Sequence, residues 1–198
     1  MSEIVDYYFT PASPWTYLGH QRFEAIARRH GAEIRYKPVD FGKIFAVSGG
    51  LPLGKRAPQR QAYRLHELER WRKFLKIPLV VQPKYHPVAS DLAAQLIIAA
   101  ERSGAAAGPI SFALLRACWA EERNIADAET LAAIAREQGL DGAKLLGAAR
   151  TPEVARRYEE LTREAIDRQV FGAPFFIYRD EPFWGQDRLD FLDRALVR

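Results

Sequence analysis

The chain has 198 residues, 48% of them hydrophobic, which is enough for one sizeable globular core. Its 29 basic and 25 acidic residues are interleaved and give a net charge of +4, which is weak support for nucleic-acid binding, and we expect no nucleic-acid partner. No stretch approaches the roughly 20 apolar residues of a membrane span, and the first residues lack the basic and apolar regions of a signal peptide, so we expect a cytoplasmic protein without a membrane segment.

The first 40 residues are predicted to form a βαβ unit. Residues 4–9 are a short β-branched and aromatic run, and Ser13-Pro14 then supplies an N-cap residue followed by proline at the first helical position. Apolar residues recur with a helical period until Gly31, which follows a basic stretch and acts as a stop signal. Residues 33–38 alternate in polarity, and their proline favours an edge strand.

The middle of the chain carries helical periodicity and no convincing strand pattern. Helices are predicted over residues 57–76, 88–103, 109–122, 127–138, 141–149 and 152–168. The period then changes to a β-hairpin over 175–184, followed by a final helix that Leu189, Leu192, Ala195 and Leu196 line.

This order predicts an α/β fold, a thioredoxin-like domain with a large all-helical insertion between its βαβ and ββα halves. Residues 1–40 and 169–198 would form the thioredoxin-like domain, and residues 41–168 the insertion, whose last helix packs back on the sheet.

The sequence Ser13-Pro14-Trp15-Thr16 stands where a dithiol protein of this fold carries CPWC. Cys118 is the single cysteine, so an internal disulfide and dithiol chemistry are excluded. A cysteine at a helix N-terminus is a good thiolate because the helix dipole and free N–H groups stabilise negative charge. A serine there can instead donate a hydrogen bond to a sulfur anion supplied from outside. The alternative is that Ser13 is only an N-cap.

Two further motifs flank the predicted hairpin. Gly172-Ala173-Pro174 lies directly before a strand, where thioredoxin-like folds carry a cis-proline, although the pattern alone leaves cis and trans equally open. Gln186 and Asp187 lead into the final helix, where Asp187 is suited to cap the helix or pair with Arg188. The strand ends that carry these motifs are expected to meet at one edge of the fold.

Three stretches together carry a resemblance: SPWTYLG near the start, RACWAEERNIAD (116–127) and VFGAPFFIYRDEPFWGQDRLDFL (170–192). Nearly end to end, the chain resembles the 2-hydroxychromene-2-carboxylate isomerases, relatives of kappa-class glutathione transferases and bacterial disulfide oxidases. The resemblance implies a glutathione-dependent isomerase that converts 2-hydroxychromene-2-carboxylate, or a related intermediate of naphthalene-type degradation, to trans-o-hydroxybenzylidenepyruvate. It also implies a homodimer, glutathione as a regenerated cofactor, and a small aromatic acid as substrate.

The resemblance also implies roles for the motif residues. Ser13 would be catalytic by stabilising the thiolate of glutathione. A cis Ala173-Pro174 bond would present the backbone of Ala173 to the cysteinyl unit. Gln186 and Asp187 would hold the γ-glutamyl end.

The substrate side departs from the family pattern. Family members carry an asparagine, and before it a lysine, beside the substrate, where this chain has Gly50 and Phe45; Lys43, Lys55 or Arg56 are candidate replacements. This departure leaves the native substrate open.

Other substrate-side candidates are aromatic or basic, and each has a structural alternative. Tyr17, Trp15 and Trp184 are suited to line an aromatic pocket, although core packing explains them equally well. Arg56, Arg60 and Arg64 share a helical face that would attract an anion, although such a run is more typical of a solvated face. No histidine lies at metal-ligand spacing, so no metal is expected.

Two other classes of function stay open. A kappa-like glutathione transferase would leave a stable conjugate. A non-catalytic thioredoxin-like binding protein would use Ser13 for structure alone.

Overall fold

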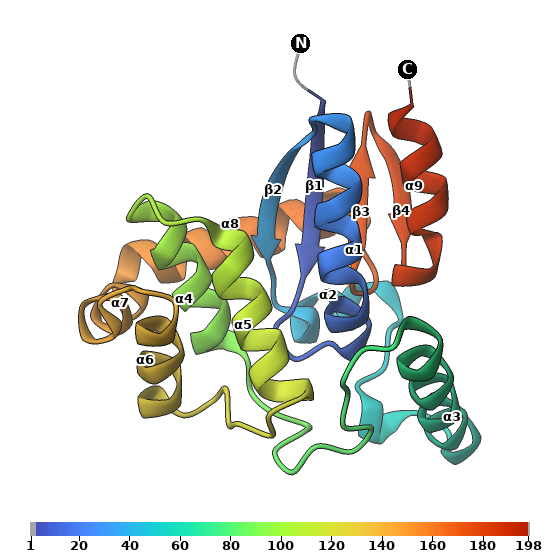
Figure 1. Ribbon diagram of the computed structural model, residues 1–198, viewed down its shortest axis with the longest axis horizontal. Helices are drawn as coiled ribbons and strands as arrows, with labels where there is room; N and C mark the ends of the chain where they lie inside the picture. The colour runs from blue at the N-terminus through green and yellow to red at the C-terminus, as the bar shows by residue number, and fades with distance from the viewer. Residues whose placement is uncertain (1–2, 198) are drawn as a thin grey trace.

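The computed structural model describes residues 3–197, which form a four-stranded sheet with helices on both faces (Figure 1). The strands are β1 (Ile4–Phe9), β2 (Glu33–Pro38), β3 (Phe175–Tyr178) and β4 (Glu181–Trp184), in the spatial order β2-β1-β3-β4. β1 pairs with β2 in parallel and with β3 antiparallel, and β3 continues into β4 as a hairpin. This is the predicted thioredoxin-like arrangement, with β2 confirmed as an edge strand.

The helices lie where the hydrophobic periods place them, with one addition. They are α1 (Pro14–His30), α2 (Phe41–Ser48), α3 (Pro58–Leu75), α4 (Asp91–Arg102), α5 (Ala107–Trp119), α6 (Ala128–Glu137), α7 (Gly142–Ala149), α8 (Pro152–Asp167) and α9 (Leu189–Leu196), with short 3-10 turns η1 (Leu53–Lys55) and η2 (Gln186–Arg188). None of the helices between residues 3 and 197 is long and apolar enough to cross a membrane.

The added helix is α2, which is absent from the predicted set. The Asp40 side chain caps its start by accepting hydrogen bonds from the N–H groups of Gly42 (2.7 Å) and Lys43 (3.3 Å). Gly49 ends it in the left-handed conformation, with φ of 75°. An N-cap aspartate and a C-terminal glycine are both recognisable signals, so α2 could have been predicted from its ends.

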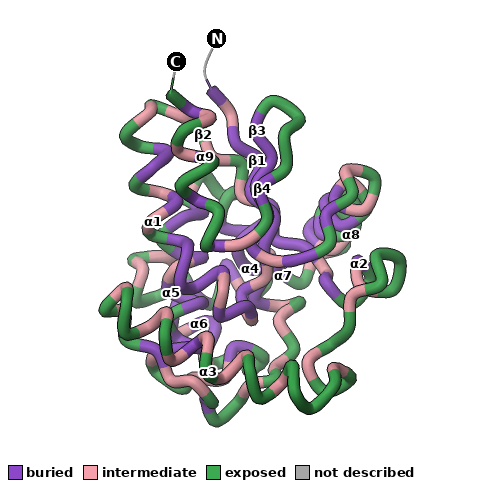
Figure 2. The backbone as a smooth tube through the Cα atoms, turned by 90° about the vertical axis from the view of Figure 1, so that its right-hand side faces the viewer, coloured by how far each residue is buried: buried purple, intermediate pink, exposed green. Residues whose placement is uncertain are grey.

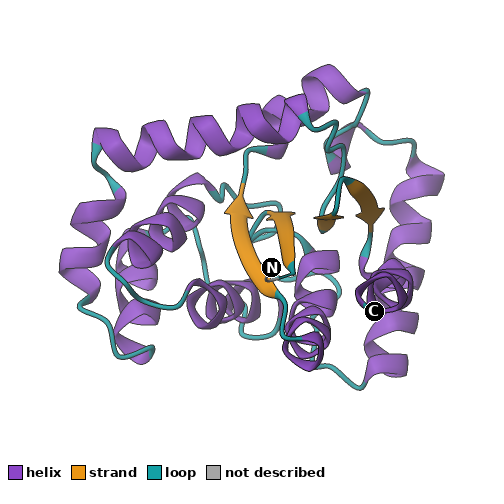
Figure 3. Cartoon of the chain, turned by 90° about the horizontal axis from the view of Figure 1, so that it is seen from above, coloured by secondary structure: helices purple, strands orange, loops and turns teal. Residues whose placement is uncertain are grey.

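The sheet is a middle layer between helices (Figures 1 and 3). Helices α1 and α9 lie on one face, and α8 runs across the other, where it contacts β2 and α4. Helices α6 and α7 lie farther out, packed on each other and against α4 and α5. Helix α3 lies at the opposite end of the molecule from α6 and α7 (Figure 1).

The most deeply buried part of the chain runs through β1 and the helices beside it (Figure 2). The ring of Tyr7 stacks between Phe9 and Phe176 at centroid distances of 4.6 and 5.1 Å, and Phe23 of α1 packs at 4.9 Å. Such aromatic contacts contribute about 0.5–1.5 kcal/mol each beyond area burial. This core fixes the end of β1 and the start of α1, which carry Ser13.

Candidate active site

A pocket with a volume of about 620 Å³ lies at the end of the sheet where β1 and β4 end and β3 begins. Its walls come from the β1–α1 turn, α2 and the loop after it, the start of α3, His86, residues 171–173 and Trp184. The expected convergence of strand ends is therefore present in the structure. The pocket is lined mainly by aromatic, small and basic residues.

Ser13 lines this pocket and also caps α1. Its Oγ accepts a hydrogen bond from the N–H of Thr16 at 3.1 Å, and the residue is 8% exposed. An accepting hydroxyl keeps its own hydrogen for donation to another group. The residue that caps α1 thus also lines the pocket. Thr16, the second hydroxyl of the motif, is fully buried and does not line the pocket.

The Ala173-Pro174 peptide bond is cis, as the resemblance implies. Ala173 lines the pocket, and the hydrogen bonds of the described residues include none to its backbone N–H or C=O. The next carbonyl, that of Pro174, accepts from the N–H of Gly185 at 2.9 Å and ties this turn to the end of β4. Ala173 therefore offers unpaired backbone groups, just before β3, on the same pocket as Ser13.

Trp184 forms an aromatic wall of the pocket. The residue is 53% exposed and packs edge-on against Phe171 at a centroid distance of 4.9 Å. A Cβ at Gly172 would collide with its indole nitrogen, so the absence of a side chain at Gly172 lets the indole lie close to the backbone. Of the three aromatic residues predicted to line such a pocket, Trp15 and Trp184 do so.

Tyr17 and Lys43, the other two residues predicted beside the substrate, are not among the described residues that line this pocket. Tyr17 is 2% exposed, donates its hydroxyl to the carbonyl of Pro78 at 2.7 Å and stacks on Phe112, so it belongs to the core. Lys43 is exposed on α2 and pairs with Glu159 of α8, which raises the pKa of the lysine. In both cases the partners of the side chain lie outside the set of residues that line the pocket.

Gln186 and Asp187 follow the pocket residue Trp184 closely in the chain but are not among the described residues that line the pocket. The Gln186 side chain is buried and accepts a hydrogen bond from Arg22 at 2.7 Å. Asp187 pairs with Arg188 at 2.8 Å, the structural alternative that the sequence allowed. Its carboxylate lies against Gly185, the residue that follows Trp184 of the pocket wall.

Packing in the loop after α2 accounts for a glycine at position 50, where the family pattern has asparagine. A Cβ built on Gly50 would lie inside contact distance of the Phe45 ring, so the ring occupies the space that a larger residue at position 50 would need. Both residues line the pocket. Gly50 and Phe45, the two positions where the resemblance led us to expect polar side chains, thus form an apolar part of the pocket wall.

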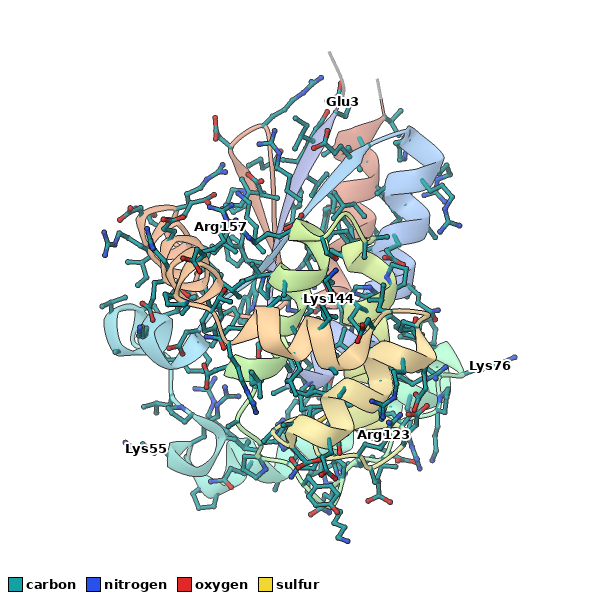
Figure 4. All side chains as sticks on the ribbon, turned by 90° about the vertical axis from the view of Figure 1, so that its left-hand side faces the viewer. Glu3, Lys55, Lys76, Arg123, Lys144 and Arg157 are labelled. Atoms are coloured by element: carbon teal, nitrogen blue, oxygen red, sulfur yellow. The ribbon has the colours of Figure 1, made fainter. Side chains whose placement is uncertain are left out.

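Three basic residues that line the pocket are Arg56, Arg60 and Arg64, here called the pocket arginines. Arg56 and Arg64 are partly buried, contrary to the solvated-face interpretation, whereas Arg60 is exposed. Burial, with a smaller effect of Arg56, lowers the pKa of Arg64 to about 10. Lys55, the other candidate replacement, is exposed on η1 (Figure 4). It is not among the described residues that line the pocket.

His86 completes the basic side of the pocket and was missed by sequence reasoning. Burial, with a smaller effect of Arg64, lowers the pKa of His86 to about 4, so the imidazole is neutral at pH 7. Its ring packs against Trp119 at a centroid distance of 4.6 Å. No local signal in the sequence distinguishes His86 from the other histidines.

Comparisons with known proteins agree with this architecture. Residues 4–197 match the family model of the DSBA-like thioredoxin domain. A 2-hydroxychromene-2-carboxylate isomerase of Pseudomonas putida is 33% identical over 200 residues, covering 98% of this chain and 95% of that protein. A protein of the same name from Sphingobium xenophagum is 30% identical and covers 100% of both chains. A solved structure of 2-hydroxychromene-2-carboxylate isomerase is 29% identical with a TM-score of 0.85, covering 98% of this chain and 94% of that one.

Proposed function

Since the chain belongs to the 2-hydroxychromene-2-carboxylate isomerase family of DSBA-like thioredoxin proteins and is an isomerase, we propose that it acts on 2-hydroxychromene-2-carboxylate or a related aromatic acid. The product would be trans-o-hydroxybenzylidenepyruvate, and glutathione would be the cofactor. The observation that carries this proposal is the position of Ser13, at the N-terminus of α1 and in the wall of an aromatic pocket.

The donor set of the pocket fits glutathione at two points. The Ser13 hydroxyl has a hydrogen to donate to a sulfur anion, and the start of α1 adds the positive end of a helix dipole. The free N–H and C=O of Ala173 match the main chain of a cysteinyl unit, as in the addition of a strand to a sheet edge. None of the described residues that line the pocket is acidic, so none of them would repel a thiolate.

When bound, glutathione would supply the thiol that adds reversibly to the conjugated double bond of the substrate and so allows the bond to rotate. Ser13 would hold the sulfur in its anionic form, which is the form that acts as nucleophile. Trp184 would face the aromatic ring of the substrate. Asp187 would bind the amino group of the γ-glutamyl end with Gln186 beside it, which requires Asp187 to share its present partner Arg188.

The test is turnover of 2-hydroxychromene-2-carboxylate with and without glutathione. The proposal expects turnover that depends on glutathione, with all of the thiol recovered at the end. Equal turnover without any thiol would contradict the cofactor role. A stable thioether that accumulates in place of the isomer would instead identify a kappa-like transferase.

A further inference from the structure

The basic side of the pocket has no acidic counterpart. None of the residues that line the pocket is acidic, and all of them lie in the described part of the chain. Of the pocket arginines, Arg60 and Arg64 lie one helical turn apart on the same side of α3, and Arg56 precedes this helix in extended backbone. A partly buried cluster of like charges is costly unless an anion accompanies it.

Arginines elsewhere on α3 are compensated. Arg70 pairs with Glu67 at 2.5 Å and Arg72 with Glu69 at 2.6 Å. By contrast, neither Arg60 nor Arg64 forms an ion pair with any described residue. Helix α3 thus carries arginines in ion pairs outside the pocket, whereas Arg60 and Arg64 in the pocket wall have no such partner among the described residues.

Arg64 is held in place by an aromatic platform. Its guanidinium lies over the ring of Trp119, 5.7 Å from the centroid, and the neutral ring of His86 packs against the same indole. Trp119 is fully buried, and its indole N–H has no hydrogen-bond partner among the described residues. Arg56 is anchored separately, because its Nε donates to the carbonyl of Leu51 at 2.8 Å. A guanidinium positioned in this way is prepared for a planar anion and loses little side-chain freedom on binding.

We propose that Arg64, assisted by Arg56, binds the carboxylate of the aromatic acid substrate, and that this pair takes over the role of the polar residues missing at Gly50 and Phe45. The inference rests on the proposed function, and it identifies Arg64 and Arg56 as the subsite that selects a substrate bearing a carboxylate. The arginine fork matches a carboxylate with two parallel hydrogen bonds, and the aromatic walls accept the ring. The pocket would therefore discriminate a carboxylate from its neutral ester, and the pocket arginines would set that preference.

The test measures binding separately from turnover. The probe is 2H-chromene-2-carboxylate, which lacks the hydroxyl needed for ring opening, with its methyl ester as the neutral partner. Calorimetric titration would compare the full chain with Arg64→Gln, Arg64→Lys and Arg70→Gln. The last variant is the matched control, since it removes the same charge from the same helix outside the pocket.

We expect Arg64→Gln to weaken binding of the carboxylate by about 10- to 100-fold and binding of the ester by less than about twofold. Arg64→Lys should recover part of the loss, and Arg70→Gln should match the unmodified chain. Arg56→Gln should show a smaller loss of the same kind, which keeps the inference testable if Arg64→Gln fails to fold. Equal losses for acid and ester, or the same loss in Arg70→Gln, would overturn the inference.

A second readout separates this inference from the proposed function. In turnover, Arg64→Gln should raise KM for the acid more than it lowers kcat, while glutathione affinity stays unchanged. A loss of glutathione affinity with unchanged binding of the acid would assign Arg64 to the cofactor and overturn the inference. If the chromene acid binds through Arg64 but no isomerisation is found, the proposed function fails and the acid subsite stands.

Discussion

The pocket has two sides that are built by different means. The strand side comprises the hydroxyl of Ser13, which the backbone at the N-terminus of α1 positions, and the backbone groups of Ala173 before β3. The helix side, comprising the pocket arginines and His86, is defined by side chains on α3 and a loop. Backbone geometry is fixed by the fold, whereas side chains can be exchanged without altering it. The strand side is thus suited to a reaction step that many substrates share. The helix side is suited to selecting one substrate among them.

The largest expected effect is on the strand side. Ser13→Ala should lower kcat/KM by about 10²- to 10³-fold, because a donor aimed at a developing or bound anion is removed. It should also lower the free energy of unfolding by about 1 kcal/mol through loss of the N-cap. Turnover assays and urea unfolding would measure the two effects.

Ser13→Asp separates the N-cap role of residue 13 from its proposed role in stabilising a thiolate. Aspartate caps a helix as well as serine does, but a carboxylate repels a thiolate. We expect unfolding to be unchanged within about 0.5 kcal/mol and turnover to be lost. Normal turnover in this variant would show that Ser13 serves only the helix.

In the loop after α2, which also lines the pocket, Gly50→Asn should destabilise the protein by about 1–3 kcal/mol, because the new side chain meets the ring of Phe45. Removing the ring in a Gly50→Asn, Phe45→Ala double variant should recover part of that loss. Thermal unfolding of both single variants and of the double variant gives the interaction free energy between positions 45 and 50. Additive effects would mean that the two positions do not share space.

His86 should make stability depend on pH. Its folded pKa of about 4 lies below its ordinary value, so between those values the unfolded chain binds a proton that the folded chain does not. The free energy of unfolding should therefore fall as pH drops from about 6.5 to about 4, by about 1–2 kcal/mol after allowance for partial solvent screening. Urea unfolding across this range should show a flatter profile for His86→Gln, and an identical profile would contradict the assignment.

The smallest effect belongs to Lys43, which lies outside both sides. Lys43→Ala removes an exposed ion pair with Glu159 and should change stability by less than about 1 kcal/mol. KM for the acid should stay within about twofold of the unmodified chain. A large increase in KM would instead indicate that Lys43 contributes to substrate binding.

The difference between the two sides also decides what the sequence could predict. Ser-Pro before a helix and Gly-Ala-Pro before a strand are local signals, and the topology that joins them followed from the hydrophobic periods. The direction of a side chain on a helix depends on packing partners far along the chain, as for Tyr17 with Pro78 and Lys43 with Glu159. His86 approaches Arg64 only through tertiary packing around Trp119, which no local pattern records.

The central claim is that Ser13 stabilises a thiolate borrowed from glutathione. The most direct measurement is calorimetric titration with glutathione while the ultraviolet absorbance of the thiolate is followed, for the unmodified chain and for Ser13→Ala. We predict binding accompanied by thiolate formation in the first protein and loss of the thiolate signal in the second. Absence of glutathione binding in both proteins, or an equal thiolate signal in both, would contradict the claim.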